Sequence, residues 1–171
     1  FYVGGHPTSP DLGTPGYGIP LNDSWFRQTL SHNTVVVDGY SQPPTHGSLA
    51  HAGGASSPTT TDAGVDWQQE PYDGVSMRRT ILQCAEGEYF VDIFTVETGG
   101  ERRLDWACRI DGDLLGTSGF VERDPVTMDG DGYEHVDEAS FLEPESLSRD
   151  SCPRLDWGLP NGRLSLFLPF E

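Results

Sequence analysis

The clearest alternation of apolar and polar residues lies in two neighbouring segments near the middle of the chain. Residues 76–84, Ser-Met-Arg-Arg-Thr-Ile-Leu-Gln-Cys, and residues 89–96, Tyr-Phe-Val-Asp-Ile-Phe-Thr-Val, predict two antiparallel strands. Residues 86–88, Glu-Gly-Glu, supply the turn between them. A second glycine-rich turn leads to residues 103–110, which predict a third strand.

A further strand is indicated by the valines at 35–37, because β-branched side chains favour a pleated surface. Asp38-Gly39 predicts a turn directly after it. Residues 6–24 are rich in Pro and Gly and predict an extended loop, and the segment 25–38 enters the strand. His32 and Asn33 therefore lie where a polar loop meets a buried strand, a place where side chains are held rigidly beside a cleft.

The remaining segments carry weaker patterns. Residues 1–5 predict the end of a strand, residues 40–64 a long polar loop or an edge ribbon, and residues 111–119 Asp/Gly turns. The acidic residues 137–151 predict at most one helical turn, and the alternation at 163–168 predicts a last strand. The sequence therefore predicts an all-β fold, a mostly antiparallel β-sandwich.

The length of 171 residues is sufficient for one domain with a sizeable core, and the 21 Gly, 13 Pro and 35% hydrophobic content fit a loop-rich β protein. No apolar run approaches the roughly 20 residues that cross a bilayer. The first residues, Phe-Tyr-Val-Gly-Gly, show neither an initiator Met nor a signal peptide. We expect residues 1–171 to be one β-sandwich domain, truncated at both ends.

The formal net charge is −17, and all ten basic residues are Arg. Such a field repels nucleic acid and anionic lipid, so we discount both as partners. A polyanionic substrate would require arginines gathered at the binding site. The acidic, lysine-free composition is also compatible with a salty environment.

Three cysteines at wide spacing, Cys84, Cys108 and Cys152, form neither a metal-binding pattern nor a dense disulfide framework. Cys84 and Cys108 lie in predicted strands, which favours small core residues. One disulfide remains open as an alternative.

Two ordered groups of motifs resemble the β-sheet domain of the heparinase II/III-like polysaccharide lyases, a family that includes alginate lyases. The first group is Asp11-Leu-Gly-Thr-Pro-Gly-Tyr17 followed by Trp25-Phe-Arg-Gln-Thr-Leu-Ser-His-Asn-Thr-Val-Val-Val-Asp-Gly39. The second group is Tyr72-Asp-Gly-Val, Arg78-Arg79-Thr, Tyr89-Phe-Val-Asp-Ile-Phe-Thr-Val-Glu97 and Leu104-Asp105-Trp106. The resemblance covers about residues 1–110.

The resemblance implies β-elimination on a uronic-acid polysaccharide by a two-domain enzyme whose N-terminal α/α toroid domain precedes this chain. That helical domain would supply most of the catalytic groups, so the fragment alone is expected to be inactive. It also implies an acidic polysaccharide or oligosaccharide as partner, and we favour a secreted or periplasmic location without assigning one.

Several relatives bind a structural zinc ion, and the resemblance places two ligands of such a site at Asp11 and His32. The remaining ligand would come from upstream of this chain. His6 lies in the turn leading to Asp11 and is a weaker candidate. For a lone histidine at a strand start, the alternative is an ordinary structural role. Neutral imidazole and carboxylate are ligands that zinc accepts.

Two further site residues come from the same stretch. The resemblance implies that Tyr17 reaches the active cleft and assists catalysis, whereas a tyrosine in a Gly-rich loop is often a packing residue. Arg27 is a candidate for binding a substrate carboxylate, and the alternative is an ion pair with Asp11 or Asp38. Asn33 is expected to bond to local backbone.

Further predictions concern residues that we assign to the fold. Asp92, Asp105 and Trp106 match family positions on strands, and Asp129-Gly-Asp-Gly predicts a plain turn rather than a calcium loop.

Two other classes of function remain open. One is a carbohydrate-binding β-sandwich without chemistry, in which Trp25, Trp67 and Tyr72 would stack on sugars. The other is an accessory domain of a glycoside hydrolase, for which the sequence does not single out a carboxylate pair. An unsaturated product distinguishes a lyase from a hydrolase.

Overall fold

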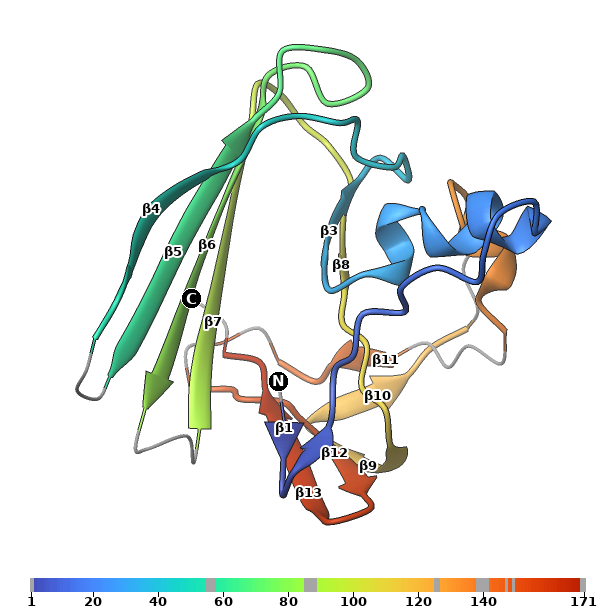
Figure 1. Ribbon diagram of the computed structural model, residues 1–171. Coiled ribbons are helices and arrows are strands. Elements are labelled where there is room, and N and C mark those ends of the chain that lie inside the picture. The colour runs from blue at the N-terminus through green and yellow to red at the C-terminus, as the bar shows by residue number, and fades with distance from the viewer. Residues whose placement is uncertain are drawn as a thin grey trace. The chain divides into compact units, whose positions relative to one another are not determined.

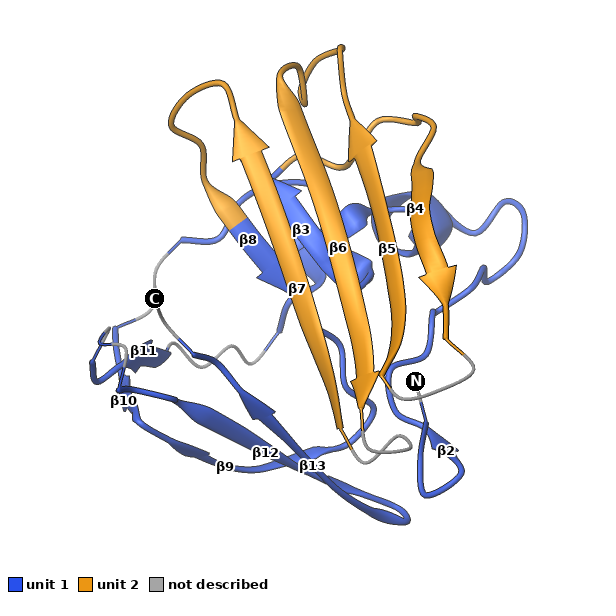
Figure 2. Ribbon diagram, turned by 90° about the vertical axis from the view of Figure 1, so that its left-hand side faces the viewer, with its two compact units in different colours: residues 1–39, 105–171 blue, residues 40–104 orange. Residues whose placement is uncertain are grey.

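The computed structural model describes residues 2–54, 58–84, 89–124, 127–137, 142–146, 148 and 150–169. Strands dominate these residues, and the pairings within the four-stranded sheet, the three-stranded sheet and the two small hairpins are antiparallel (Figure 1). This confirms the all-β class, and the set of antiparallel sheets is consistent with a β-sandwich. The chain divides into two compact units: unit 1 comprises residues 1–39 and 105–171, and unit 2 comprises residues 40–104 (Figure 2).

Unit 2 is built on one four-stranded sheet with the order β4-β5-β6-β7 (Figure 2). Its strands are β4 (Ser48–Gly53), β5 (Thr59–Asp66), β6 (Val75–Cys84) and β7 (Tyr89–Thr98). The antiparallel pairing of β6 and β7 confirms the prediction from their alternating residues. The turn predicted at residues 86–88 lies outside the described residues.

Of the two alternatives predicted for residues 40–64, the edge ribbon is correct and the long loop is wrong, because this segment contains the edge strand β4 and most of β5. Polar side chains obscured the signal, since Thr59, Thr60 and Thr61 carry no apolar alternation. In the sheet the polar side chains find partners across strands. Asp62 on β5 accepts two hydrogen bonds from the guanidinium of Arg78 on β6, one of them at 2.8 Å.

The core of unit 2 lies at the β5–β6 connection. Trp67 and Tyr72 have exposed fractions of 4% and 0%, and their ring centroids are 5.0 Å apart. Both polar ring atoms are satisfied, because the Trp67 indole donates to the Pro43 carbonyl and the Tyr72 hydroxyl donates to the Tyr40 carbonyl. These aromatics are therefore packing residues.

Unit 1 contains β3 (Thr34–Val37), which pairs with β8 (Leu104–Ala107), a strand lying almost wholly in this unit. Val35, Val36 and Val37 are all buried, so β3 is covered on both faces. The strand predicted at 103–110 is thus confirmed in part: it is shorter than expected. The turn predicted at Asp38-Gly39 is also present.

Unit 1 also holds a three-stranded sheet, β13-β12-β9, and two small hairpins, β1–β2 and β10–β11 (Figure 1). The sheet strands are β9 (Asp113–Ser118), β12 (Arg154–Leu159) and β13 (Gly162–Phe167). The hairpins are formed by β1 (Tyr2–Val3), β2 (His6–Pro7), β10 (Phe120–Glu122) and β11 (Leu142–Pro144).

One prediction for unit 1 is wrong. Residues 113–118 form β9 rather than turns, and the pattern was hidden because the strand is exposed along its length and the register with β12 shifts near Asp156. In the segment 137–151 the described residues include β11, and residues 138–141, 147 and 149 lie outside the described part, so the helical turn stays a prediction. The last strand, predicted at 163–168, is confirmed as β13.

The predicted turn at residues 129–132 is confirmed and leads into a short 3-10 helix, η4 (Tyr133–His135). Gly130 has φ 140°, and a Cβ there would lie 2.3 Å from the Gly39 carbonyl oxygen. The Asp131 amide donates to that same carbonyl at 2.8 Å. This close backbone approach requires glycine.

The predictions for Cys84 and Cys108 have different outcomes. Cys84 is half-buried on β6, but Cys108 is exposed just after β8, so its assignment to the core is wrong. The three cysteines form no disulfide with one another. Among the described helices, none has the length and apolar character to span a membrane.

Candidate functional site

The candidate site is the loop between β2 and β3 in unit 1, where the sequence places Asp11, Tyr17, Arg27 and His32. Gly13, Gly16 and Gly18 all have positive φ, so the chain turns repeatedly before it reaches the helical segments. These are a π-helix, η1 (Asn22–Phe26), and a 3-10 turn, η2 (Thr29–Ser31). His32 follows η2 directly and precedes the buried strand β3, which fixes the position of its backbone.

Asp11 and His32 are brought together, 21 residues apart in sequence. Oδ2 of Asp11 lies 2.9 Å from Nδ1 of His32, and Oδ1 of Asp11 accepts the Gly13 amide at 2.8 Å. The hydrogen bond from Gly13, followed by the one from His32, lowers the pKa of the Asp11 carboxyl below its ordinary value. Asp11 is therefore a carboxylate at neutral pH.

The other nitrogen of the His32 ring, Nε2, lies 3.2 Å from the Phe26 carbonyl oxygen. Both ring nitrogens thus face oxygen atoms that accept hydrogen bonds. A neutral imidazole has one N–H and would leave its second nitrogen lone pair facing an oxygen. Only a protonated ring donates to both oxygens, and a cation held between Nδ1 and the Asp11 carboxylate would satisfy the neutral ring equally well.

The two atoms of this pair, a carboxylate oxygen and an imidazole nitrogen, are donor types that zinc sites use. Two ligand atoms that are each about 2.0–2.2 Å from one tetrahedral ion lie about 3.4 Å apart, whereas Asp11 Oδ2 and His32 Nδ1 are 2.9 Å apart, a hydrogen-bond distance. Within the described part of the chain, no group of three or more His, Cys, Asp or Glu side chains could hold a metal ion. The pair therefore supplies at most half of a tetrahedral site.

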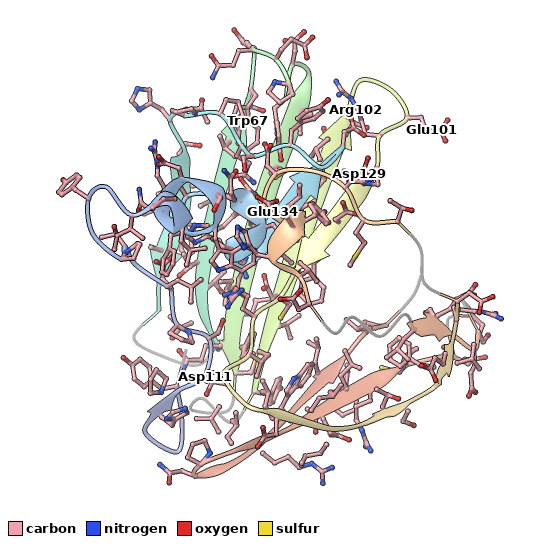
Figure 3. The ribbon with its side chains drawn as sticks, turned by 90° about the vertical axis from the view of Figure 1, so that its right-hand side faces the viewer. Trp67, Glu101, Arg102, Asp111, Asp129 and Glu134 are labelled. Carbon is pink, nitrogen blue, oxygen red and sulfur yellow. The ribbon has the colours of Figure 1, made fainter. Side chains whose placement is uncertain are left out.

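His6 does not join this pair. Its Nε2 lies 3.5 Å from Oδ2 of Asp111, an exposed residue beside the β1–β2 hairpin (Figure 3). The two histidines of this region thus have separate carboxylate partners, Asp111 for His6 and Asp11 for His32.

Tyr17 and Arg27 are both exposed, and the structure does not join them to the Asp11–His32 pair. The Tyr17 side chain is fully exposed between two glycines. Arg27 forms an ion pair with Asp23 at 3.2 Å, one helical turn earlier, so the partners expected from sequence, Asp11 and Asp38, are wrong. This ion pair is itself largely exposed and therefore weak.

Asn33 does more than the local bonding expected from sequence. Its amide donates to the Ser9 hydroxyl at 2.6 Å, and its Oδ1 accepts the backbone N–H of Arg109 at 2.5 Å. The residue after His32 thus joins the loop to the segment that follows β8. This long-range role is a correction to the sequence interpretation.

A cluster that sequence reasoning missed surrounds Trp25. The guanidinium carbon of Arg109 lies 5.2 Å from the centroid of the Trp25 ring, and the His135 ring contacts Trp25 at 5.7 Å between centroids. Nε2 of His135 lies 2.9 Å from the Ser24 hydroxyl. Of the three aromatic residues predicted to stack on sugars, Trp67 and Tyr72 are buried, so their assignment to such a platform is wrong. Trp25 is half-buried and contacts Arg109 and His135.

The residues assigned to the fold behave largely as expected. Asp92 on β7 forms a two-pronged ion pair with Arg79 on β6, at 2.9 and 2.6 Å. Asp105 on β8 accepts a hydrogen bond from the hydroxyl of Tyr133 in η4. Trp106 lies on β8 but is 42% exposed.

Comparison with known proteins assigns the chain to a family. The description of the matching family is heparinase II/III-like, C-terminal, and it covers residues 1–146. The chain belongs to the heparinase II/III-like family. The match extends beyond the region of about residues 1–110 that the sequence motifs cover.

One curated relative is an alginate lyase of Stenotrophomonas maltophilia (strain K279a), 28% identical over 182 residues. The alignment covers 91% of this chain and 24% of the relative, so the heparinase II/III-like chain spans about a quarter of that protein's length. No solved structure matches the chain significantly.

Proposed function

We propose that this chain is the C-terminal β domain of a polysaccharide lyase that cleaves a uronic-acid-containing polysaccharide by β-elimination. The observation that carries the proposal is the family match over residues 1–146. The similarity to an alginate lyase supports a uronate polymer as the substrate class. An N-terminal helical domain would complete the active site. This agrees with the alignment, which covers only 24% of the relative's length.

The reaction removes the proton at C5 of a uronate unit and expels the glycosidic oxygen at C4. The electron pair of the C5–H bond forms the C4–C5 double bond, a base takes the C5 proton, and an acid protonates the leaving oxygen. The C5 proton is weakly acidic, so the adjacent carboxylate must be neutralised by hydrogen bonds or positive charge. In this proposal the loop between β2 and β3 forms one wall of the cleft in which that happens.

Within this loop we assign a catalytic role to Tyr17 and a substrate-binding role to Arg27. Full exposure leaves the Tyr17 hydroxyl available to a bound sugar. A substrate carboxylate could replace Asp23 at Arg27 with little loss, because exposed ion pairs contribute only about 0–1 kcal/mol. Guanidinium groups bind carboxylates through two parallel hydrogen bonds.

Asp11 and His32 would position the loop and hold a structural zinc ion together with ligands from outside this chain. Bound zinc would cross-link the loop to the start of β3. The chain's own residues already provide the arrangement, since the Gly13 amide orients the Asp11 carboxylate and the Phe26 carbonyl orients the His32 ring. Such partners of metal ligands fix their orientation.

The test is an assay of the full-length protein that carries this chain. The protein is incubated with alginate, heparin-like chains and other uronate polymers, and ultraviolet absorbance from a C4–C5 double bond is followed. Growth of that absorbance is the expected result. New reducing ends without absorbance would indicate a hydrolase, and binding without any cleavage would indicate an accessory module.

A further inference from the structure

Arginine is the only permanently cationic side chain in this lysine-free chain, and most of the described arginines are already paired. Among the described residues, single carboxylates neutralise Arg27, Arg78, Arg79 and Arg123, and Asp156 lies beside both Arg154 and Arg163. Arg102 donates to backbone carbonyls. A paired guanidinium must give up its partner before it binds another carboxylate.

Arg109 differs from this set. Its guanidinium lies over the Trp25 ring at 5.2 Å, and no carboxylate among the described residues pairs with it. The side chain is half-buried, which weakens solvent screening relative to a fully exposed arginine. A guanidinium stacked on an aromatic face keeps its N–H donors in its own plane, parallel to the ring, where they remain available to a planar acceptor.

The position of Arg109 is fixed from two sides. Its backbone N–H donates to Oδ1 of Asn33 at 2.5 Å. The ring beneath the guanidinium is held by its contact with His135, whose Nε2 is within 2.9 Å of the Ser24 hydroxyl. A side chain held in one orientation loses less entropy when a ligand binds to it.

The same contacts place Arg109 beside the candidate site. Asn33, which holds the Arg109 backbone, follows His32 in sequence. Trp25, which holds the guanidinium, precedes Phe26, whose carbonyl oxygen is the partner of His32 Nε2. Both anchors of Arg109 are thus sequence neighbours of residues in the Asp11–His32 arrangement.

We propose that Arg109, supported by Trp25, binds a carboxylate of the acidic saccharide, at a subsite next to the loop that carries Asp11 and His32. This inference rests on the proposed uronate substrate. The guanidinium would donate two parallel hydrogen bonds to one carboxylate. In a chain of net charge −17, this guanidinium, which pairs with no carboxylate of the described residues, would provide local attraction for a polyanion.

The experiment measures binding of a short uronate oligosaccharide to the full-length protein by isothermal titration calorimetry. Arg109→Gln removes the charge, Arg109→Lys keeps the charge but loses the paired donors, and Arg123→Gln is the control. Arg123 is an exposed arginine of unit 1 that is already paired with Glu143. The same oligosaccharide with its carboxyls reduced to alcohols serves as a neutral ligand, and thermal unfolding reports on the fold of each variant.

We expect Arg109→Gln to weaken binding of the acidic oligosaccharide by about ten- to a hundredfold, the usual effect of a hydrogen bond to a charged group. Arg109→Lys should lose less, and Arg123→Gln should bind like the wild type. The neutral ligand should bind wild type and Arg109→Gln alike. A sulfated polymer without carboxylates that competes through Arg109 as well as the uronate does would show that the site recognises negative charge in general and not the carboxylate, and would overturn the assignment.

Equal affinity of Arg109→Gln and wild type for the uronate would also overturn the proposal. So would an equal loss of acidic and neutral ligands, because that pattern indicates a structural role. The proposed function fails separately: absence of an unsaturated product, with binding that still depends on Arg109, would reject the lyase and keep the subsite. If Arg109→Gln forms the unsaturated product at the normal rate and binds the uronate with unchanged affinity, the lyase is kept and the subsite is rejected.

Discussion

Replacement of Asn33 by alanine tests the link between the candidate loop and the segment after β8. The change removes the hydrogen bond to the Ser9 hydroxyl and leaves the Arg109 N–H without its acceptor. A net hydrogen bond contributes about 1 kcal/mol, and a donor left without a partner in a partly buried place costs about 1–3 kcal/mol. We therefore expect Asn33→Ala to lower the free energy of unfolding by about 2–3 kcal/mol.

Two companion variants separate the two bonds. Ser9→Ala removes only the hydroxyl partner and should cost about 1 kcal/mol or less. Asn33→Asp keeps the oxygen that accepts the Arg109 N–H, and the Ser9 hydroxyl can donate to the new carboxylate. It should therefore retain more than half of the stability that Asn33→Ala loses.

The assay combines chemical denaturation with hydrogen exchange at the backbone amide of Arg109. If the amide exchanges by local opening, a loss of about 2–3 kcal/mol corresponds to exchange about 30- to 150-fold faster. Unchanged exchange at Arg109 together with an unchanged denaturation midpoint in Asn33→Ala would refute the reasoning. A fall in stability without faster exchange at Arg109 would place the lost interaction elsewhere.

Three further outcomes follow from other contacts. Tyr72→Phe should cost about 1 kcal/mol of unfolding free energy, because it leaves the Tyr40 carbonyl without its 2.8 Å donor; no change in denaturation midpoint would contradict this. Gly130→Ala should cost about 1–3 kcal/mol or more, since φ is 140° and the new Cβ would meet a backbone oxygen at 2.3 Å; a midpoint within experimental error of the wild type would be unexpected. The hydrogen bond from Ser165 and two nearby guanidinium groups lower the pKa of Asp156. Its stabilisation is therefore fully present above the ordinary pKa of about 4 and is lost as pH falls through the lower folded value. The stability gap between wild type and Asp156→Asn should close in acid, and a gap that is equally wide at pH 2 and pH 7 would contradict the shift.

The sequence predicted those parts of the fold whose residues carry their own signal. The alternation at 76–84 and 89–96 identified β6 and β7, and the valines at 35–37 identified β3. Strand β9 was missed, and β4 and β5 were predicted only as one of two alternatives, because their side chains are mostly polar or exposed. Cross-strand partners stabilise such strands instead. The Asp62–Arg78 ion pair is one such partner, and no local pattern reveals it.

The sequence likewise predicted only some residues of the candidate site. Family motifs pointed to Asp11 and His32, and the structure places these two side chains in contact. The roles of Asn33 and Arg109 could not be predicted, because their hydrogen bond joins residues 76 positions apart. A hydrogen bond of that span depends on the tertiary fold. The position of His32-Asn33 directly before β3 was the one local sign that Asn33 has a structural role.

The central claim is that this chain serves a β-elimination and that the Asp11–His32 pair supports it. The most direct measurement is the rate of absorbance growth on a uronate polymer for full-length wild type, His32→Ala and His6→Ala. His6 is the matched control, since it is also a histidine of unit 1 beside a carboxylate, that of Asp111. The account predicts a rate at least about tenfold lower for His32→Ala, as for other groups that orient an active site, and a rate near that of the wild type for His6→Ala. Equal rates for the two variants, or no absorbance from the wild type on any uronate polymer, would contradict it.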